Sequence, residues 1–68
     1  MLMNLKAKMW QKGITGRRLA KLLGIRPETF SDKINGRSDF TRTEMFLIRD
    51  TFFEDIDMAY LFLKTENK

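Results

Sequence analysis

The stretch GIRPETFSDKINGR, residues 24–37, decides how this chain folds. Gly24 follows a leucine-rich segment and predicts a left-handed turn, because a residue without a Cβ adopts positive φ at little cost. Pro27 suits the first turn of a new helix, where its missing N–H is not needed. Phe30 and Ile34, four residues apart, predict the buried side of that helix, and the Asn-Gly pair that follows ends it. The stretch therefore predicts a turn followed by a short helix.

Four further helices are predicted around this stretch, at about 4–11, 15–23, 41–52 and 55–63. Gly13 ends the first of them, Thr15 is the N-cap of the second, and the sequence TRTE at 41–44 has the spacing of a capping box. Repeats, linkers and low-complexity tracts are absent from the sequence. The fold class expected is all-α, with residues 1–68 forming one compact five-helix domain.

Composition excludes several classes of function. The 68 residues include no cysteine and no histidine, which removes disulfides, thiol and imidazole chemistry and the usual transition-metal ligands. The opening MLMNLKAKMW is too rich in lysine for a signal peptide, and no apolar run approaches the ~18 residues of a membrane span. We expect a cytoplasmic protein without a cofactor. We expect no enzyme either, because the acidic cluster Glu54, Asp55 and Asp57 has no nucleophile or base beside it and is typical of a helix N-terminus.

Charge is distributed unevenly along the chain. Residues 1–42 hold ten Lys/Arg against three Asp/Glu, a net charge of +7, whereas residues 43–68 hold three against six, a net charge of −3. A basic front and an acidic back indicate a polyanionic partner on one side of the molecule. The alternative is a basic surface that only keeps the protein in solution.

The spacing of residues 15–34 fits one helix, a tight turn and a second helix that crosses the first. Ala20 is small where the two helices must approach closely, and Gly24 lies at the turn four residues later. Ile25 and Phe30 are then expected to point into the core. The spacing therefore indicates a helix-turn-helix.

These residues resemble the lambda-repressor-like, Cro/C1-type helix-turn-helix family, especially the single-domain regulators of bacteriophages. The resemblance covers about residues 5–53 and is strongest in the fragments LAKLLGI, TFS and INGRSDFT. It implies a five-helix fold, double-stranded operator DNA as the ligand, and a homodimer on a pseudo-palindromic site in the bacterial nucleoid.

Two departures from the family pattern concern a pair of core positions and the start of the helix at 15–23. Met9 and Ile34 stand where the family often has a buried ion pair, and we expect them to replace it with apolar packing. Arg17 and Arg18 lie in the first turn of their helix, where positive charge is unfavourable by about a few tenths to 1 kcal/mol each. A bound phosphate would offset that cost, and a solvated basic face is the alternative.

The third departure is in the helix that the resemblance assigns to the major groove. The positions that read base edges in the family correspond here to Pro27, Glu28, Thr29, Ser31 and Asp32. Glu28 and Asp32 can accept a hydrogen bond from cytosine N4, and Pro27 can contact a thymine methyl. We expect Arg26 or Lys33 to pair with the two acids. The alternative is that Glu28 only complements the positive N-terminal end of the helix dipole and does not contact a base.

Basic and polar residues surround these acids and are expected to bind the sugar–phosphate backbone. This phosphate-binding set comprises Gly16, Arg17, Arg18, Arg26, Lys33, Asn35, Arg37, Ser38, Thr41 and Arg42.

The helix at 41–52 has more apolar residues than one buried stripe needs. Met45, Ile48 and Phe52 supply the core face, and Trp10 on the first helix is also difficult to bury fully. Either the last helix covers the surplus, or the surplus forms a dimer or partner surface. That surface would comprise Phe46, Leu47, Phe53, Met58 and Phe62.

Two functions follow from these patterns. The first is a sequence-specific, dimeric DNA-binding regulator of transcription, either a repressor or a Cro-like switch protein. The second is a protein-interaction module on the same fold, such as an anti-repressor, which would use the surplus apolar surface.

Overall fold

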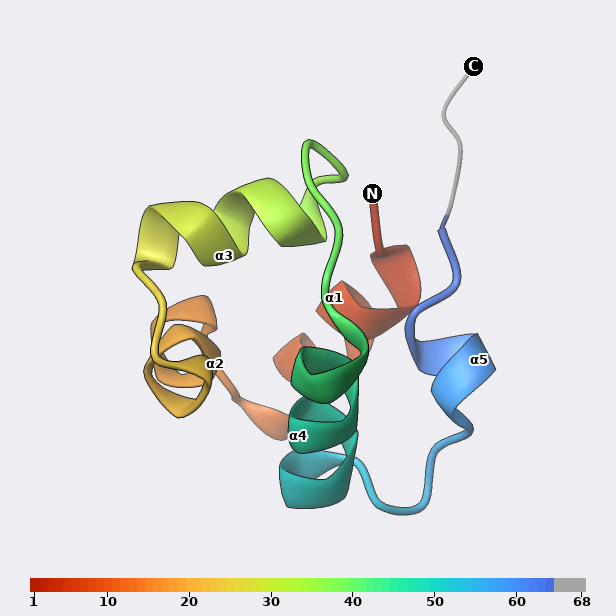
Figure 1. Cartoon of the computed structure of the whole chain (residues 1–68). Coiled ribbons are helices and arrows are strands. Elements are labelled where there is room, and N and C mark those ends of the chain that lie inside the picture. Colours follow the sequence, from red (N-terminus) through yellow and green to blue (C-terminus); the bar gives the residue numbers. More distant parts are fainter. Residues whose placement is uncertain (65–68) are drawn as a thin grey trace.

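The computed structural model describes residues 1–64, which form a compact globule of five α-helices without a β-strand (Figure 1). The helices are α1 (Met3–Lys12), α2 (Gly16–Leu23), α3 (Pro27–Ile34), α4 (Arg42–Phe52) and α5 (Met58–Leu61). In Figure 1, α4 lies between the α2–α3 pair and α5. The all-α, five-helix prediction is confirmed for this part of the chain. None of its helices is long and apolar enough to cross a lipid bilayer.

The predicted helix ends are confirmed where a local side chain or a glycine sets them. The Thr15 side chain accepts from Arg18 N at 3.1 Å and caps α2. Thr41 and Glu44 form the full capping box at the start of α4. Gly13 and Gly24 end α1 and α2 with φ of +68° and +71°, the left-handed region in which a side chain is disfavoured.

One apolar core joins all five helices. Met9 and Ile34 are both buried in it, which confirms the expectation that these two positions pack as apolar residues. Leu2 N donates to Ile34 O at 2.9 Å, so the start of the chain also holds the end of α3. The buried set is Leu2, Leu5, Met9, Ile14, Leu19, Ala20, Phe30, Ile34, Phe40, Ile48, Phe53 and Leu61.

The corner between α2 and α3 is closely packed. Ala20 is fully buried, and its carbonyl accepts from Ile25 N at 3.0 Å across the turn. A Cβ added to Gly16 would lie 3.2 Å from the Phe30 ring, so the first residue of α2 also approaches α3 closely. Small residues at the start and in the middle of α2 thus allow the crossing that the sequence predicts.

The C-terminal segment corrects two predictions. The last helix spans only Met58–Leu61, not 55–63, because its N-cap is Asp57, whose carboxylate accepts from Tyr60 N at 3.1 Å. The preceding residues form a turn closed by Ile56 N and Phe53 O at 3.0 Å. Phe53 was expected at a partner surface but is 0% exposed. It follows the last residue of α4 with φ of −135°, so helical periodicity does not place its ring.

Candidate nucleic-acid interface

The outer side of α3 is open to solvent, as a surface that contacts a ligand must be. Pro27, Glu28, Thr29 and Ser31 are all exposed, and Asp32 is half-buried. Pro27 is in the first turn of α3, where its ring fixes the backbone without the loss of a helical hydrogen bond. The structure therefore brings the five residues predicted to read bases onto one short helix.

The two acids of α3 have different surroundings. Asp32 Oδ1 accepts from Arg37 Nη1 at 2.7 Å, an exposed ion pair between α3 and the loop that follows it. Glu28 has no ion pair or side-chain hydrogen bond within residues 1–64. The prediction that Arg26 or Lys33 pairs with these acids is wrong, because Lys33 points to another helix and Arg26 makes no ion pair.

Lys33 instead connects α3 to α4. Its Nζ lies 2.6 Å from Glu44 Oε1, and the two side chains are only 12% and 15% exposed. Burial by itself would raise the pKa of Glu44, but hydrogen bonds from Lys33 and Thr41 and the Lys33 charge outweigh it, so the pKa lies below its ordinary value. Because Glu44 holds its ammonium group in this way, Lys33 is not available to contact a phosphate.

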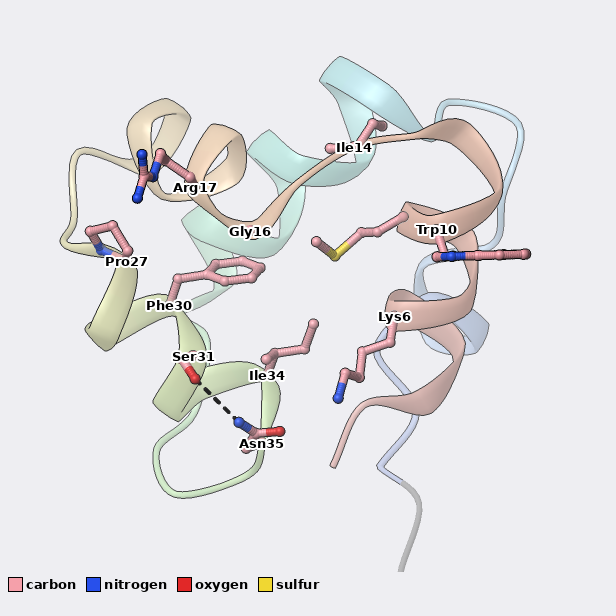
Figure 2. Close-up of a pocket in the computed structure, with 11 residues that line it drawn as sticks. Lys6, Trp10, Ile14, Gly16, Arg17, Pro27, Phe30, Ser31, Ile34 and Asn35 are labelled. Atoms are coloured by element: carbon pink, nitrogen blue, oxygen red, sulfur yellow. Dashed lines mark hydrogen bonds between the residues drawn. The ribbon is translucent and has the colours of Figure 1, made fainter.

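The two arginines at the start of α2 also point in different directions. The Arg18 guanidinium lies 5.0 Å from the centroid of the Phe52 ring, a cation–π contact with α4. Arg17 is exposed, has no ion pair among the described residues and lies close to Pro27 of α3 (Figure 2). Arg17 is therefore the better placed of the two for a ligand at α3.

The loop from α3 to α4 carries the remaining polar residues of the phosphate-binding set. Asn35 Nδ2 donates to Ser31 Oγ at 3.3 Å, which connects the end of α3 to its exposed side. Ser38 and Arg42 are exposed, while the Thr41 hydroxyl is used in the capping box. Arg26, the N-cap of α3, and Arg42, the first residue of α4, are cations that have no acidic partner within residues 1–64.

Beside this surface lies a groove that the sequence did not predict. It has a volume of about 390 Å³ and lies between α1, the start of α2 and α3 (Figure 2). Lys6 and Trp10 of α1 line it, although neither was assigned to a site from the sequence. The surplus of apolar residues was the available signal, since Trp10 could not be placed fully inside.

The apolar surface predicted for a partner is only partly exposed. Phe46 and Leu47 of α4 are 45% and 42% exposed, as expected of residues outside the buried stripe. Phe62 is half-buried, with its ring centroid 5.6 Å from that of Phe40 in an edge-to-face arrangement, and Met58 is half-buried as well. Tyr60 of α5 is 49% exposed.

Comparisons of the chain with protein-family models, with curated proteins and with solved structures give no match. The function is therefore inferred from the residues and geometry described above.

Proposed function

We propose that this protein is a sequence-specific DNA-binding regulator of transcription, of the lambda-repressor-like type that its sequence resembles. The observation that carries the proposal is the α2–Gly24–α3 corner, which holds α3 with most of its outer side exposed to solvent. In this account α3 enters the major groove of double-stranded DNA.

Cations around α3 would supply most of the affinity. Arg17, Arg26 and Arg42 are exposed and have no acidic partner in the described chain, so each can contact a phosphate without the loss of an ion pair. Such contacts fix the position of the protein on the duplex but carry little sequence information.

Base preference would come from the first turns of α3. The unpaired carboxylate of Glu28 can accept a hydrogen bond from cytosine N4, and the Pro27 ring can contact a thymine methyl. Arg37 partly neutralises Asp32, which reduces its repulsion from phosphates and leaves one carboxylate oxygen able to accept. The proposed readout is therefore directed at cytosine and is unusual in its use of acids.

A homodimer would place two copies of α3 about 34 Å apart, one helical turn of DNA. The exposed Phe46 and Leu47 are the apolar residues available for such contact. The same two residues favour the alternative, a module that binds another protein through α4. Sedimentation equilibrium with and without DNA, on the wild type and on Phe46→Ser with Leu47→Ser, separates a self-associating surface from one that needs a different partner.

Binding to labelled duplex DNA tests the proposal itself. We expect the affinity, measured by fluorescence anisotropy, to fall steeply with salt and to exceed the affinity for heparin at every salt concentration. Equal affinity for heparin and for all duplexes would remove the claim of sequence-specific binding.

A further inference from the structure

The groove between α1 and α3 has an apolar floor. Met9, Phe30 and Ile34 form the floor. Figure 2 shows the side chains of Phe30 and Ile34 pointing from α3 toward α1. Each is buried by the rest of the chain but still borders the groove. A volume of about 390 Å³ is enough for two or three apolar side chains of a ligand, at the lower end of the range of ~300–1,000 Å³ typical of binding pockets.

The charged groups at the rim all have the same sign. None of the lining residues is acidic, and Lys6 and Arg17 lie on opposite sides of the groove (Figure 2). Neither side chain forms an ion pair or a hydrogen bond within residues 1–64. The groove therefore complements a ligand that is apolar at its centre and acidic at its ends.

Trp10 forms one edge of the groove and is 85% exposed. A tryptophan this exposed leaves a large apolar area in water, and buried tryptophans are among the residues that contribute most to protein–protein binding. In Figure 2 the ring points away from Phe30 and Ile34, so a ligand that fills the groove would cover the ring by continuing over α1. The favourable free energy of burying the Trp10 ring is thus available only in a complex.

We propose that this groove binds an acidic amphipathic peptide segment of another protein. Apolar side chains of the segment fill the floor, its carboxylates pair with Lys6 and Arg17, and its backbone or a further apolar side chain covers Trp10. Duplex DNA fits the groove less well, because its backbone presents charged phosphates and no apolar group that could fill the floor.

The groove shares residues with the surface proposed to bind DNA. Arg17, Pro27 and Ser31 border the groove and also belong to the predicted DNA contacts. A peptide in the groove would therefore exclude DNA from α3, and the protein that carries the segment would act as an inhibitor of DNA binding. This consequence rests on the proposed function, whereas binding of the peptide does not.

Selection from a random twelve-residue peptide library displayed on phage tests the proposal. Selection on the full chain should enrich peptides that combine Leu, Phe or Trp with Asp or Glu at the ends. Synthetic copies of enriched peptides that contain no tryptophan should shift the emission of Trp10, the single tryptophan of the chain, to shorter wavelength as the ring is buried. A double-stranded oligonucleotide should then compete with the peptide.

Charge reversal provides the matched control. Lys6→Glu with Arg17→Glu should weaken the binding of the acidic peptides about tenfold or more. A selection on this variant should enrich peptides with Lys and Arg instead of Asp and Glu. Lys8→Glu with Lys21→Glu changes the net charge equally at residues outside the groove and should leave the peptide affinity within about twofold. Thermal unfolding followed by circular dichroism verifies that both variants fold.

The inference would be overturned if no peptides were enriched over the charge-reversed variant, or if both variants lost peptide binding equally. It would also be overturned if duplex DNA shifted the Trp10 emission and the peptides did not. The last outcome would assign the groove to DNA. If peptides bind as expected and duplex DNA does not bind at all, the groove is a peptide-binding site and the proposed function is wrong.

Discussion

Lys33 Nζ lies 2.6 Å from Glu44 Oε1, and this contact fixes α3 relative to α4. The same Glu44 oxygen accepts from Thr41 N at 2.9 Å, as the capping box requires. One carboxylate thus both begins α4 and holds the helix proposed to contact DNA. Because both side chains are largely buried and face each other, the loss of either leaves a charged group that is poorly solvated.

The pH dependence of stability should reveal this contact. The pKa of Glu44 in the folded protein lies below its ordinary value of 4.5. The ionised carboxylate therefore makes its full contribution to the free energy of unfolding above the unfolded pKa, and this contribution is lost as pH falls through the folded pKa. Glu44→Gln keeps the capping acceptor but removes the charge, and should lower the free energy of unfolding by about 1–2 kcal/mol near neutral pH. Urea unfolding should show this difference shrinking below about pH 4. A difference that stays constant down to about pH 3 would contradict the assignment.

Substitutions of the two arginines of α2 should have different effects, one on DNA affinity and the other on stability. Arg17→Ala should weaken binding to every duplex and reduce the salt slope by about 1, because one phosphate contact is lost. Arg18→Ala should instead lower the free energy of unfolding by about 0.5–1 kcal/mol, because its guanidinium lies over the Phe52 ring. Anisotropy titrations over a range of salt, together with urea unfolding, measure both effects. The opposite pattern, with Arg18 dominant in DNA binding, would mean that the contact with Phe52 opens in the complex.

Glu28 tests whether α3 reads bases. Glu28→Gln removes a negative charge and adds a donor at an exposed position without an internal partner, so stability should change by less than about 0.5 kcal/mol. We expect either a changed base preference or stronger binding to all duplexes, because repulsion from phosphates is removed. Competition among duplexes that differ at one base pair distinguishes the two. No change in affinity or preference would mean that this residue does not face a base.

Gly24 tests the turn between α2 and α3. Its φ is +71° and no atom lies within 4 Å of an added Cβ, so Gly24→Ala isolates the backbone cost of the left-handed conformation. We expect the free energy of unfolding to fall by about 1–2 kcal/mol. Gly13→Ala is the matched control, since it has φ of +68° and equally open surroundings at the end of α1. If the turn positions α3 for DNA, only Gly24→Ala should also weaken DNA binding beyond its effect on the folded fraction.

Local signals in the sequence were sufficient for most of the fold. Thr15, Gly24 and the capping box at 41–44 act through residues within one turn, so the ends of α2 and α4 could be predicted from neighbours alone. The last helix was predicted too long because several acids compete for the N-cap, and only Asp57 has the geometry to accept from the first turn. Phe53 was misplaced because the chain leaves helical periodicity one residue before it.

The candidate site was harder to predict, because its contacts depend on tertiary packing. Lys33 is one residue from Asp32 in the sequence, yet it pairs with Glu44 on another helix. Arg18 follows Arg17 directly, but it packs on Phe52. The groove beside Trp10 depends on how α1 packs against α3, which local patterns do not specify. The surplus of apolar residues indicated only that Trp10 lies outside the core. Exposure of the outer side of α3 did follow from its two buried positions, Phe30 and Ile34.

In vitro selection of bound DNA from a random duplex pool, read at two salt concentrations, shows whether α3 reads base sequence. One consensus should be enriched at both salt concentrations, with cytosine at the positions that face the start of α3. For a dimer, two half-sites should lie about one helical turn apart. Overall affinity should fall with salt while the consensus stays the same. A pool that remains random at both salt concentrations, with affinity set by salt alone, would rule out sequence-specific binding by this protein.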